Sequence, residues 1–499
     1  MDAEQFRAEG RRIGDLVADY LESVERRPVT SGLAPGDVRR RLPEHPTTEP
    51  EPMDAVLADL ADVVIPGLTH WQHPNFFAYF PGNSSYPSIL ADLLTAGLGV
   101  QGMSWVTSPA CTEVETLMLD WMQELLGLPD EFRSTSDNGG GVIQGSASEA
   151  TLSSILAARW RATGGAVNTD GDTSRLVAYC TAQSHSSIEK GLRIAGIGTR
   201  NIRLVPHDDS FSMRVDQLEL MVRDDLAAGL VPFWVCSTHG TTSSGAFDPT
   251  SAIGAVARRH GLWLHVDAAM HGIAALEPTL RWVNDGLEVA DSYCTNPHKW
   301  MGVNFDCDLF WVRDRASLLG ALSILPEYLR SAAAQSGQAI DYRDWQIPLG
   351  RRFRSLKLWF AIRLEGVESF RAMIREHVRI TSELAAELSR DPRFVVVAPH
   401  PLNLLCLRVA GHDDAEADRR TDALVEAANA TGRVHQFTEK PTGLAHVTFL
   451  GGAATDREAQ HAASVEHRAG EEDATGGVGR FHQRVGATIG LRVVVPGDA

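Results

Sequence analysis

Apolar residues near the amino terminus recur at three- and four-residue spacing, with charged residues between them. The apolar positions are Phe6, Ile13, Leu16, Val17, Tyr20, Leu21 and Val24. This spacing predicts an amphipathic helix.

A proline-rich stretch that includes Arg39, Arg40 and Arg41 then interrupts the pattern. A second helix is predicted by the apolar positions Met53, Val56, Leu57, Leu60 and Val64. Because each helix has only one apolar stripe, the pair must pack on another surface.

In the middle of the chain, short continuous apolar segments alternate with helical patterns. The predicted strands are 141–144, 176–180, 233–236, 262–266, 290–294 and 307–312. Apolar strands separated by helices predict an α/β fold with a mostly parallel sheet covered on both faces. Ligands of such sheets bind at the carboxyl ends of the strands, so residues that follow these strands are the first candidates for a site.

The pattern changes beyond about residue 373, where strands at 394–397 and 402–409 and a helix near 415–430 predict a small α+β domain. Segment 451–480 has only Val465 and Val478 as sizeable apolar residues, which predicts disorder. We therefore expect three parts. They are a helical arm over 1–84, a large domain over 85–372 and a small carboxyl-terminal domain over 373–499.

Composition narrows the function classes. A chain of 499 residues with 43% hydrophobic and 22% charged residues is typical of a globular protein with more than one domain. The net charge of -18 argues against nucleic acid or an anionic membrane as a partner, because both attract a basic surface. The amino terminus lacks the basic and apolar regions of a secretion signal, and no apolar run reaches the ~18 residues of a membrane span.

The six cysteines show neither a C-x-x-C pair nor a zinc-like cluster with histidine, so no metal site is expected. Several of them lie in apolar strands. Reduced core residues in a cytoplasmic protein are the expectation.

Lys299 is the most informative single residue, since it follows the apolar strand 290–294 within the run 296–300, Asn-Pro-His-Lys-Trp. A lysine at such a junction either extends to solvent or has its pKa lowered for Schiff-base chemistry. Upstream, the strand 262–266 delivers Asp267 to its carboxyl end. Pyridoxal phosphate needs a lysine for its aldehyde and an acid for its ring nitrogen. The ordinary alternative for Asp267 is a helix N-cap.

A glycine-rich run, 139–148, ends a short strand and opens a helix. Gly145 allows close approach, and the Ser-Ala-Ser segment after it can hold a phosphate with backbone amides and hydroxyls. Taken alone, the run favours a plain glycine turn with a serine N-cap over a phosphate site.

Together these segments resemble the aromatic-L-amino-acid decarboxylases, the group II pyridoxal-phosphate-dependent decarboxylases that also include histidine, tyrosine and tryptophan decarboxylases. The resemblance extends over about residues 1–440. Its dense blocks are 70–81, 108–113, 145–150, 265–269, 296–300 and 345–357. It implies the aspartate-aminotransferase-like fold type I and a homodimer whose amino-terminal arm embraces the partner subunit. Packing of the arm on its own chain remains the alternative. From about residue 443 the family pattern fades, which either a frameshift or a divergent terminus would explain.

The resemblance also implies residue roles. Lys299 holds the cofactor, Asp267 pairs with its ring nitrogen, and His185 stacks on the ring and helps to orient the substrate. The remaining cofactor contacts that the resemblance implies are Ser146, Ala147, Ser148, Thr242, Asn296 and His298. His265 and His271 have no implied role and are predicted to be structural.

Tyr328 matches the family tyrosine that donates a proton to the substrate α-carbon after carbon dioxide leaves. It precedes 331–338, a small and polar run that predicts a mobile loop. Relatives that make aldehydes commonly carry phenylalanine at this position or lack the histidine that matches His185. Because this chain keeps both residues, the resemblance favours decarboxylation to an amine.

The substrate pocket is expected to include Trp71, Tyr79, Phe80, Gly82, His185 and Gly350, with Phe76 as a further aromatic wall. Histidine-specific relatives tend to have serine at the position of Gly350, and dopa-handling relatives usually have threonine at that of Gly82. We therefore expect tryptophan, phenylalanine or tyrosine to be used at least as well as dopa. The alternatives are an aromatic aldehyde synthase, a histidine decarboxylase, a transaminase and, outside catalysis, a non-catalytic cofactor-binding dimer.

Overall fold

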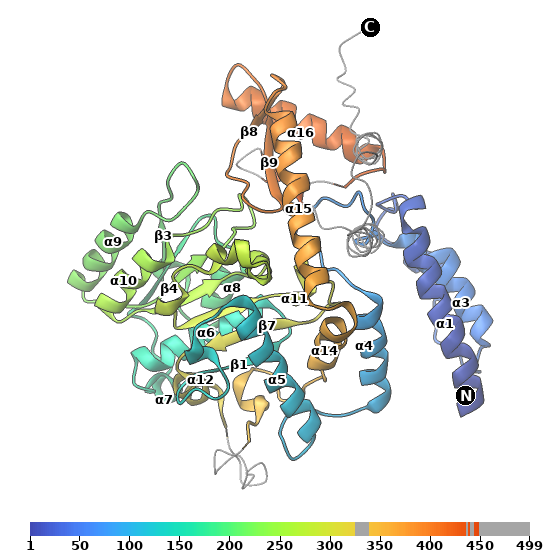
Figure 1. The fold of residues 1–499 in the computed structure, drawn as a ribbon, viewed down its shortest axis with the longest axis horizontal. Coiled ribbons are helices and arrows are strands. Elements are labelled where there is room, and N and C mark those ends of the chain that lie inside the picture. Colours follow the sequence, from blue (N-terminus) through green and yellow to red (C-terminus); the bar gives the residue numbers. More distant parts are fainter. Residues whose placement is uncertain (325–338, 436–437, 440–443, 449–499) are drawn as a thin grey trace, which may run out of the picture.

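The computed structural model describes residues 1–324, 339–435, 438–439 and 444–448 (Figure 1). Within these ranges, the large domain contains a seven-stranded sheet with the order β1-β7-β6-β5-β4-β2-β3. Its strands are β1 (Gly140–Gln144), β2 (Leu176–Thr181), β3 (Ile202–Val205), β4 (Val231–Thr238), β5 (Trp263–Asp267), β6 (Ser292–Thr295) and β7 (Asp308–Val312). Strand β7 runs antiparallel to β1 and β6, whereas the pairings from β6 through β5, β4 and β2 to β3 are parallel.

All six predicted strands form, and the mostly parallel sheet is confirmed. Strand β3 was not predicted because it is short, lies at the sheet edge and carries Arg203 beside Leu204, which is 58% exposed. The antiparallel direction of β7 was not predicted either, since an apolar run has the same pattern in both directions.

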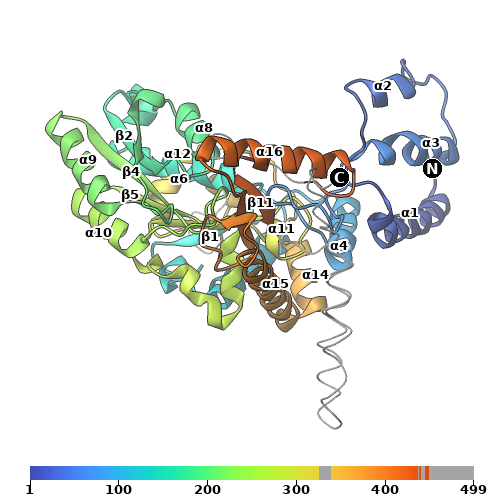
Figure 2. The same ribbon diagram turned by 90° about the horizontal axis from the view of Figure 1, so that it is seen from above.

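Helices cover both faces of this sheet (Figures 1 and 2). The helices of the large domain are α4 (Tyr86–Leu98), α5 (Pro109–Leu126), α6 (Ala147–Ala162), α7 (Val167–Asp170), α8 (Ser187–Ile194), α9 (Val215–Ala227), α10 (Thr250–His260), α11 (Pro297–Trp300), α12 (Arg315–Leu322) and α14 (Ser355–Glu365). Helix α6 lies across β4 to β7, where Trp234 Nε1 donates to Ser154 Oγ at 3.2 Å. On the opposite face, α10 packs against β4 and β5.

The core between these layers contains the fully buried Trp234, Trp263, Trp300 and Trp311. All six cysteines are buried free thiols, as predicted. No helix in the described part of the chain is long and apolar enough to cross a membrane.

The amino-terminal arm contains α1 (Ala3–Ser23), α2 (Asp37–Arg41) and α3 (Met53–Asp59), and both views show it standing beside the main body (Figures 1 and 2). The two predicted amphipathic helices form, but part of the arginine-containing interruption is itself the short helix α2. An ion pair of 2.6 Å between Arg12 and Asp54 joins α1 to α3. Phe6 and Val56 are 61% and 52% exposed, so this chain leaves part of the arm's apolar surface uncovered.

The carboxyl-terminal region begins with the long helix α15 (Val367–Leu388), which spans residue 373. It continues with β8 (Phe394–Val396), β9 (Leu404–Val409), α16 (Asp414–Ala430), β10 (Thr438–Glu439) and β11 (Leu444–Thr448). The strands form an antiparallel sheet in the order β10-β11-β9-β8. The expected strands near 394 and 404 and the helix near 415–430 are therefore present. Segment 451–480, for which disorder was predicted, lies outside the described residues.

Candidate active site

Lys299 lies in a single helical turn, α11, directly beyond the carboxyl end of β6. Asn296 is the N-cap of this turn, and Pro297 follows it, where the fixed φ of proline suits the first helical position. The backbone N–H of Lys299 donates to the carbonyl of Asn296 at 3.0 Å. Burial lowers the pKa of Lys299, while Asp267 and other nearby acidic groups act in the opposite direction. A lysine whose pKa is lowered has more of the neutral amine, which is the nucleophilic form.

Asp267 is the last residue of β5, and its register partner on β6 is Cys294. The residue is 5% exposed. One carboxylate oxygen, Oδ1, accepts the backbone N–H of Ala269 at 3.1 Å, so the N-cap-like contact considered for this residue is present. That contact does not exclude a second role, because a carboxylate has further acceptor capacity and Asp267 interacts electrostatically with Lys299.

His185 follows β2 and precedes α8 at the same end of the sheet. Its Nδ1 accepts the backbone N–H of Ser187 at 3.2 Å, and Ser187 Oγ lies 2.8 Å from the same nitrogen. Since a backbone N–H can only donate, Nδ1 is an acceptor and the ring proton of the neutral form is on Nε2. The residue keeps accessible surface, but partial burial lowers the pKa of His185, and both Asp267 and Lys299 contribute to its electrostatic environment. The structure therefore brings His185, Asp267 and Lys299 together.

The segment predicted to bind a phosphate forms the amino terminus of α6, which is called the cradle below. Ser146 is the N-cap but makes no side-chain capping hydrogen bond. The backbone carbonyl of Ser146 accepts the N–H groups of Glu149 and Ala150, while the N–H groups of Ala147 and Ser148 belong to the first turn, which has no intrahelical acceptors. Such a terminus, with the positive end of the helix dipole, favours an anion.

Two carboxylates and one guanidinium lie close to this segment. A Cβ added at Gly145 would stand 3.2 Å from both Asp306 Oδ2 and Glu149 Oε2, and 3.7 Å from Arg354 Nη2. Arg354 pairs with Asp306 at 3.0 Å, but its Nη1 is buried without a partner. Sequence reasoning missed Arg354, although the arginine-rich block 345–357 contained it. An unpaired guanidinium nitrogen beside an anion cradle is a further candidate phosphate contact.

The other expected cofactor contacts surround the same end of the sheet. Asn296 is 2% exposed, and its Oδ1 has no hydrogen-bond partner. His298 Nδ1 accepts the backbone N–H of Cys307 at 2.9 Å, and burial lowers the pKa of His298 to about 3, so its ring is neutral. Thr242 lies in the turn after β4, where Thr241 rather than Thr242 makes the internal hydrogen bond to Ser244.

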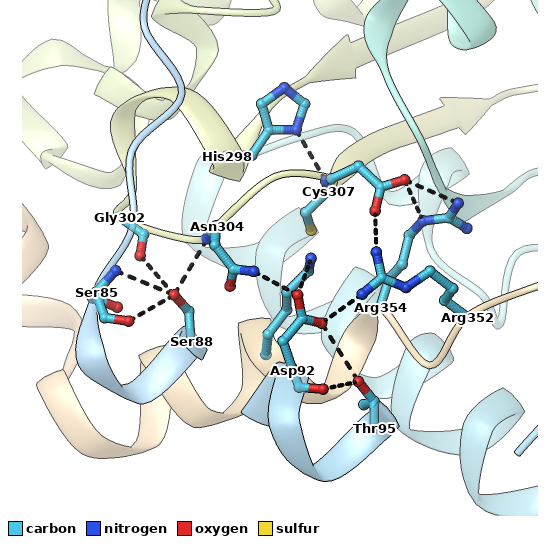
Figure 3. A network of polar contacts seen from close by, with 12 residues as sticks. Ser85, Ser88, Asp92, Thr95, His298, Gly302, Asn304, Cys307, Arg352 and Arg354 are labelled. Carbon is cyan, nitrogen blue, oxygen red and sulfur yellow. Dashed lines mark hydrogen bonds and ion pairs between the residues drawn. The ribbon is translucent and has the colours of Figure 1, made fainter. Parts of the chain in front are cut away.

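A polar network holds the segment that follows Lys299 against α4 and α14 (Figure 3). Asp92 on α4 accepts hydrogen bonds from Asn304 at 2.5 Å and from the buried Lys357 at 3.5 Å. Ser88 Oγ donates to the carbonyl of Gly302 at 3.3 Å and accepts the N–H of Asn304 at 3.2 Å. These contacts link the loop between α11 and β7 to two helices, which limits movement of the Lys299 turn.

Segment 80–83 lines one side of this turn. The amine of Lys299 lies 5.7 Å from the centre of the Phe80 ring. The N–H of Asn83 donates to the carbonyl of His298 at 3.0 Å, which places Gly82 beside the turn. A Cβ added at Gly82 would stand 3.7 Å from that carbonyl, an ordinary van der Waals contact. A larger side chain at residue 82 therefore has room at its first carbon.

Trp71, Phe76 and Tyr79 form a separate aromatic group, with ring centres 4.8 Å apart for Trp71 and Phe76 and 5.7 Å apart for Trp71 and Tyr79. Phe76 is 2% exposed, and its role as a pocket wall stays a prediction. Tyr79 is 49% exposed and has a φ of 63°, a strained conformation for a residue with a side chain.

Gly350 lies on an exposed loop beside the segment before α5. A Cβ added at Gly350 would stand 3.3 Å from Gln101 Nε2, and the backbone carbonyl of Arg351 accepts the N–H of Gly102 at 3.1 Å. Neither contact involves the Lys299 turn. The expected contribution of Gly350 to the pocket therefore stays a prediction. Tyr328 and the predicted mobile loop 331–338 lie outside the described residues.

His265 and His271 occupy buried, hydrogen-bonded positions. His265 Nδ1 lies 2.9 Å from Ser292 Oγ, and His271 Nε2 lies 3.1 Å from Asn403 Oδ1. Burial lowers the pKa of each to about 4, so both rings are neutral. These are the surroundings of structural histidines.

The residues at this end of the sheet fit pyridoxal phosphate. They include an amine of lowered pKa on Lys299 and a buried carboxylate on Asp267. Anion-binding groups are present at the start of α6, and Arg354 Nη1 is a buried donor without a partner. A buried donor without a partner is costly, so a phosphate that accepts a hydrogen bond from it would be stabilised.

Comparisons with known proteins agree with this arrangement. The family model described as "Pyridoxal-dependent decarboxylase conserved domain" matches residues 35–410. The chain is 46% identical to phenylacetaldehyde synthase of Arabidopsis thaliana over 440 residues, which are 87% of this chain and 89% of that protein. It is 44% identical to aromatic-L-amino-acid decarboxylase of Bos taurus over 442 residues, which are 87% of this chain and 89% of that protein. Among solved structures, TDC of Oryza sativa with PLP and tryptamine matches with a TM-score of 0.88 and 36% identity, over 94% of this chain and 98% of that one.

Proposed function

Since the chain belongs to the pyridoxal-dependent decarboxylase family, and within it to the aromatic-L-amino-acid decarboxylases, we propose that it converts an aromatic L-amino acid to the corresponding amine and carbon dioxide. Its cofactor is pyridoxal phosphate. The observation that carries the proposal is the convergence of Lys299, Asp267 and His185 at the carboxyl end of the sheet. Product analysis with a panel of amino acids tests it.

In the proposed mechanism, the bound cofactor supplies a ring that accepts the electrons of the breaking bond. Lys299 would hold the cofactor through its amine. Asp267 keeps a proton on the ring nitrogen. His185, whose Nδ1 is held by Ser187, presents its Nε2–H and its ring face to the bound molecules.

The phosphate is assigned to Ser146, Ala147, Ser148 and Asn296, with His298 and Thr242 as further cofactor contacts. Phe80, Trp71 and Tyr79 are proposed to exclude water from the substrate carboxylate, which favours loss of neutral carbon dioxide. Tyr328 then donates a proton to the substrate α-carbon.

An aldehyde-forming reaction is the second candidate, because phenylacetaldehyde synthase of Arabidopsis thaliana is 46% identical to this chain. The proposed proton donor decides between the two outcomes. The wild-type protein is expected to release amine and carbon dioxide in equal amounts. Tyr328→Phe is expected to lose amine formation and to consume oxygen and water, with aldehyde, ammonia and hydrogen peroxide as additional products. Mass spectrometry and an oxygen electrode measure both outcomes.

Tyr342→Phe is a matched control, because the hydroxyl of Tyr342 contacts Thr116 Oγ1 at 2.9 Å. It removes a tyrosine hydroxyl while leaving the proposed proton donor in place, and amine should remain the product. An unchanged amine yield from Tyr328→Phe would show that another group protonates the α-carbon. Aldehyde from the wild-type protein would favour the second candidate.

We also infer that the working form is a homodimer. Helix α4 exposes Leu90, Leu93, Leu94 and Leu98 by 47–60%, and Phe6 and Val56 of the arm are exposed as well. Contiguous exposed leucines are unusual on a monomer surface and are typical of a protein interface. The exposed Ile347 and Leu349 next to Gly350 extend this apolar character to the loop before α14, so a partner would also cover that loop.

The substrate prediction rests on Gly82, which leaves space but no hydroxyl beside the Lys299 turn. Loss of one hydrogen bond to a catechol would cost roughly 0.5–1.5 kcal/mol, or about three- to tenfold in preference. L-tryptophan, L-phenylalanine or L-tyrosine should therefore be turned over at least as well as L-dopa, with L-histidine and L-glutamate poor. Side-by-side kcat/KM measurements test this order, and Gly82→Thr should move the preference toward dopa. Strong dopa selectivity of the wild-type protein would contradict the argument.

A further inference from the structure

A strip of buried polar side chains lies behind Asp267 on one face of the sheet, and the proposed mechanism uses only Asp267 itself. Alternate residues of a strand point to the same face, so Trp263, His265 and Asp267 of β5 share one. The register pairs His265 with Ser292 and Asp267 with Cys294, which brings these two β6 residues to the same face. His265, Ser292 and Cys294 are fully buried. Because buried polar groups are costly unless they are bonded, their contacts indicate what the strip does.

Hydrogen bonds run along this strip from Trp263 toward Asp267. Trp263 Nε1 donates to Ser292 Oγ at 2.8 Å, and the same Oγ lies 2.9 Å from His265 Nδ1. Among the described residues, Ser292 Oγ bonds to these two side chains only. Since the indole N–H can only donate, the single hydroxyl proton of Ser292 is left to donate to His265 Nδ1. The ring proton of the neutral histidine is therefore on Nε2.

The Nε2 side of this ring faces Cys294. His265 Nε2 lies 4.0 Å from Cys294 Sγ, and Sγ in turn lies 4.0 Å from Asp267 Oδ1, the longest separation at which sulfur still makes a hydrogen bond. Burial raises the pKa of Cys294 well above its ordinary value, so the thiol keeps its proton. With the Nε2–H of His265 directed at the sulfur, the thiol proton is directed to Oδ1 of Asp267. Every proton of the strip thus points toward the carboxylate.

This contact makes the two oxygens of Asp267 different. Oδ1 accepts the thiol of Cys294 and, at 3.1 Å, the backbone N–H of Ala269. Within the described part of the chain, every hydrogen bond to the carboxylate is made to Oδ1. Oδ2 is therefore the oxygen that is left for the ring nitrogen of the cofactor.

We propose that Cys294, oriented by Ser292 and His265, is a positioning residue that holds the Asp267 carboxylate with Oδ2 toward the cofactor. The proposal rests on the function proposed for Asp267 and deepens it. Cys294 acts through Asp267, and its proton stays on sulfur throughout. Because a thiol is a weak donor, its effect on the rate is modest, and its vibrational spectrum is the sharper measurement.

Infrared spectroscopy of the full-length holoenzyme tests the contact itself, because the S–H stretch absorbs where few other protein groups do. Subtracting the spectrum of Cys294→Ala from that of the wild-type protein isolates the Cys294 band. The same subtraction is made in the Asp267→Asn background. There the band should move to higher frequency, since an amide oxygen is a weaker acceptor than a carboxylate. A band that stays in place would overturn the proposal.

Cys236 provides the matched control. It is also fully buried and lies on β4 as the register partner of His265, but its thiol donates to the carbonyl of Ser237 at 3.6 Å. The Cys236 band, isolated with Cys236→Ala, should keep its frequency in Asp267→Asn. An equal movement of both bands would mean a general change in the sheet and would also overturn the proposal.

Steady-state kinetics test the positioning role. Cys294→Ala should lower kcat by about two- to fivefold with little change in KM, the lower part of the range for one hydrogen bond. Cys294→Ser keeps a donor of nearly the same size and should recover most of that loss, whereas Cys236→Ala should match the wild-type protein. An unchanged kcat in Cys294→Ala, or an equal loss in Cys236→Ala, would contradict the role.

The two kinds of failure are distinguishable. The infrared measurement requires no turnover, so an unmoved band would leave the roles proposed for Lys299 and Asp267 intact. A wild-type protein that forms neither amine nor aldehyde would contradict the proposed function and leave the thiol contact as measured. If Cys294→Ala does not fold, Cys294→Ser replaces it, because serine also removes the S–H band.

Discussion

Lys299→Ala is expected to lack the visible absorbance of the lysine-bound cofactor and to lose decarboxylation by roughly 10⁴-fold or more, a loss comparable to that of a catalytic nucleophile. The reason is chemical, because alanine has no amine with which to bond to the cofactor aldehyde. The wild-type protein should be yellow, and borohydride should abolish its absorbance band by reducing the bond to Lys299. Absorbance spectra before and after borohydride, with peptide mapping of the reduced lysine, measure the effect.

Lys357 provides a matched control. It is also a fully buried lysine, but its amine pairs with Asp92 at 3.5 Å in the network that holds the Lys299 segment (Figure 3). Lys357→Met is expected to retain the borohydride-sensitive band even if it lowers stability. A band that persists in Lys299→Ala would contradict the assignment of Lys299, and a band lost only in Lys357→Met would transfer it to Lys357.

Asp267→Asn is expected to lower kcat by about 10²–10³-fold, the usual cost of removing one group that stabilises charge as it develops. The cofactor should still bind, because Lys299 and the start of α6 are unchanged. Asparagine is nearly the same size as aspartate but cannot neutralise a protonated ring nitrogen, so the loss should appear in kcat more than in KM. Steady-state kinetics and the absorbance band together separate a weaker reaction from a loss of cofactor.

Asp291→Asn is the control for that variant. Asp291 lies just before β6, at the opposite end of the sheet, where it pairs with Arg161 at 2.7 Å. The Asp291→Asn substitution should change the stability of the protein and leave its kcat close to the wild-type value. A kcat for Asp267→Asn within about twofold of the wild-type, which is less than 0.5 kcal/mol, would show that its charge is not needed.

Local patterns were sufficient to predict much of the large domain. Strand β5 forms where the apolar run 262–266 predicted it, because a short apolar run between helical patterns is typical of a strand buried on both faces. Asp267 is the last residue of β5, at the carboxyl end of the strand, and Lys299 lies just beyond the carboxyl end of β6. Both were candidates because polar residues at these strand ends face the ligand site of a parallel sheet. The position of several cysteines within apolar strands likewise predicted that they are buried free thiols, as all six are.

Other features depend on contacts between distant segments. Phe76 and Tyr79 belong to one aromatic run, yet stacking on Trp71 leaves Phe76 buried and Tyr79 half exposed. No local sequence pattern distinguishes Phe76 from Tyr79. Similarly, an arginine-rich block indicates positive charge, but only the packing of Arg354 beside Asp306 and Gly145 leaves one of its nitrogens unpaired at the anion cradle.

The sequence by itself determined most of the strands and helices, the residues that follow several strands and the family resemblance, because periodicity and short motifs are properties of neighbouring residues. Tertiary structure decided the direction of β7, and with it the position of its first residue, Asp308, opposite Gln144. An apolar strand reads the same in both directions, so its first residue can lie at either end of the sheet. The pairing with β1 and β6, whose hydrogen bonds and buried side chains are non-local, selects one end.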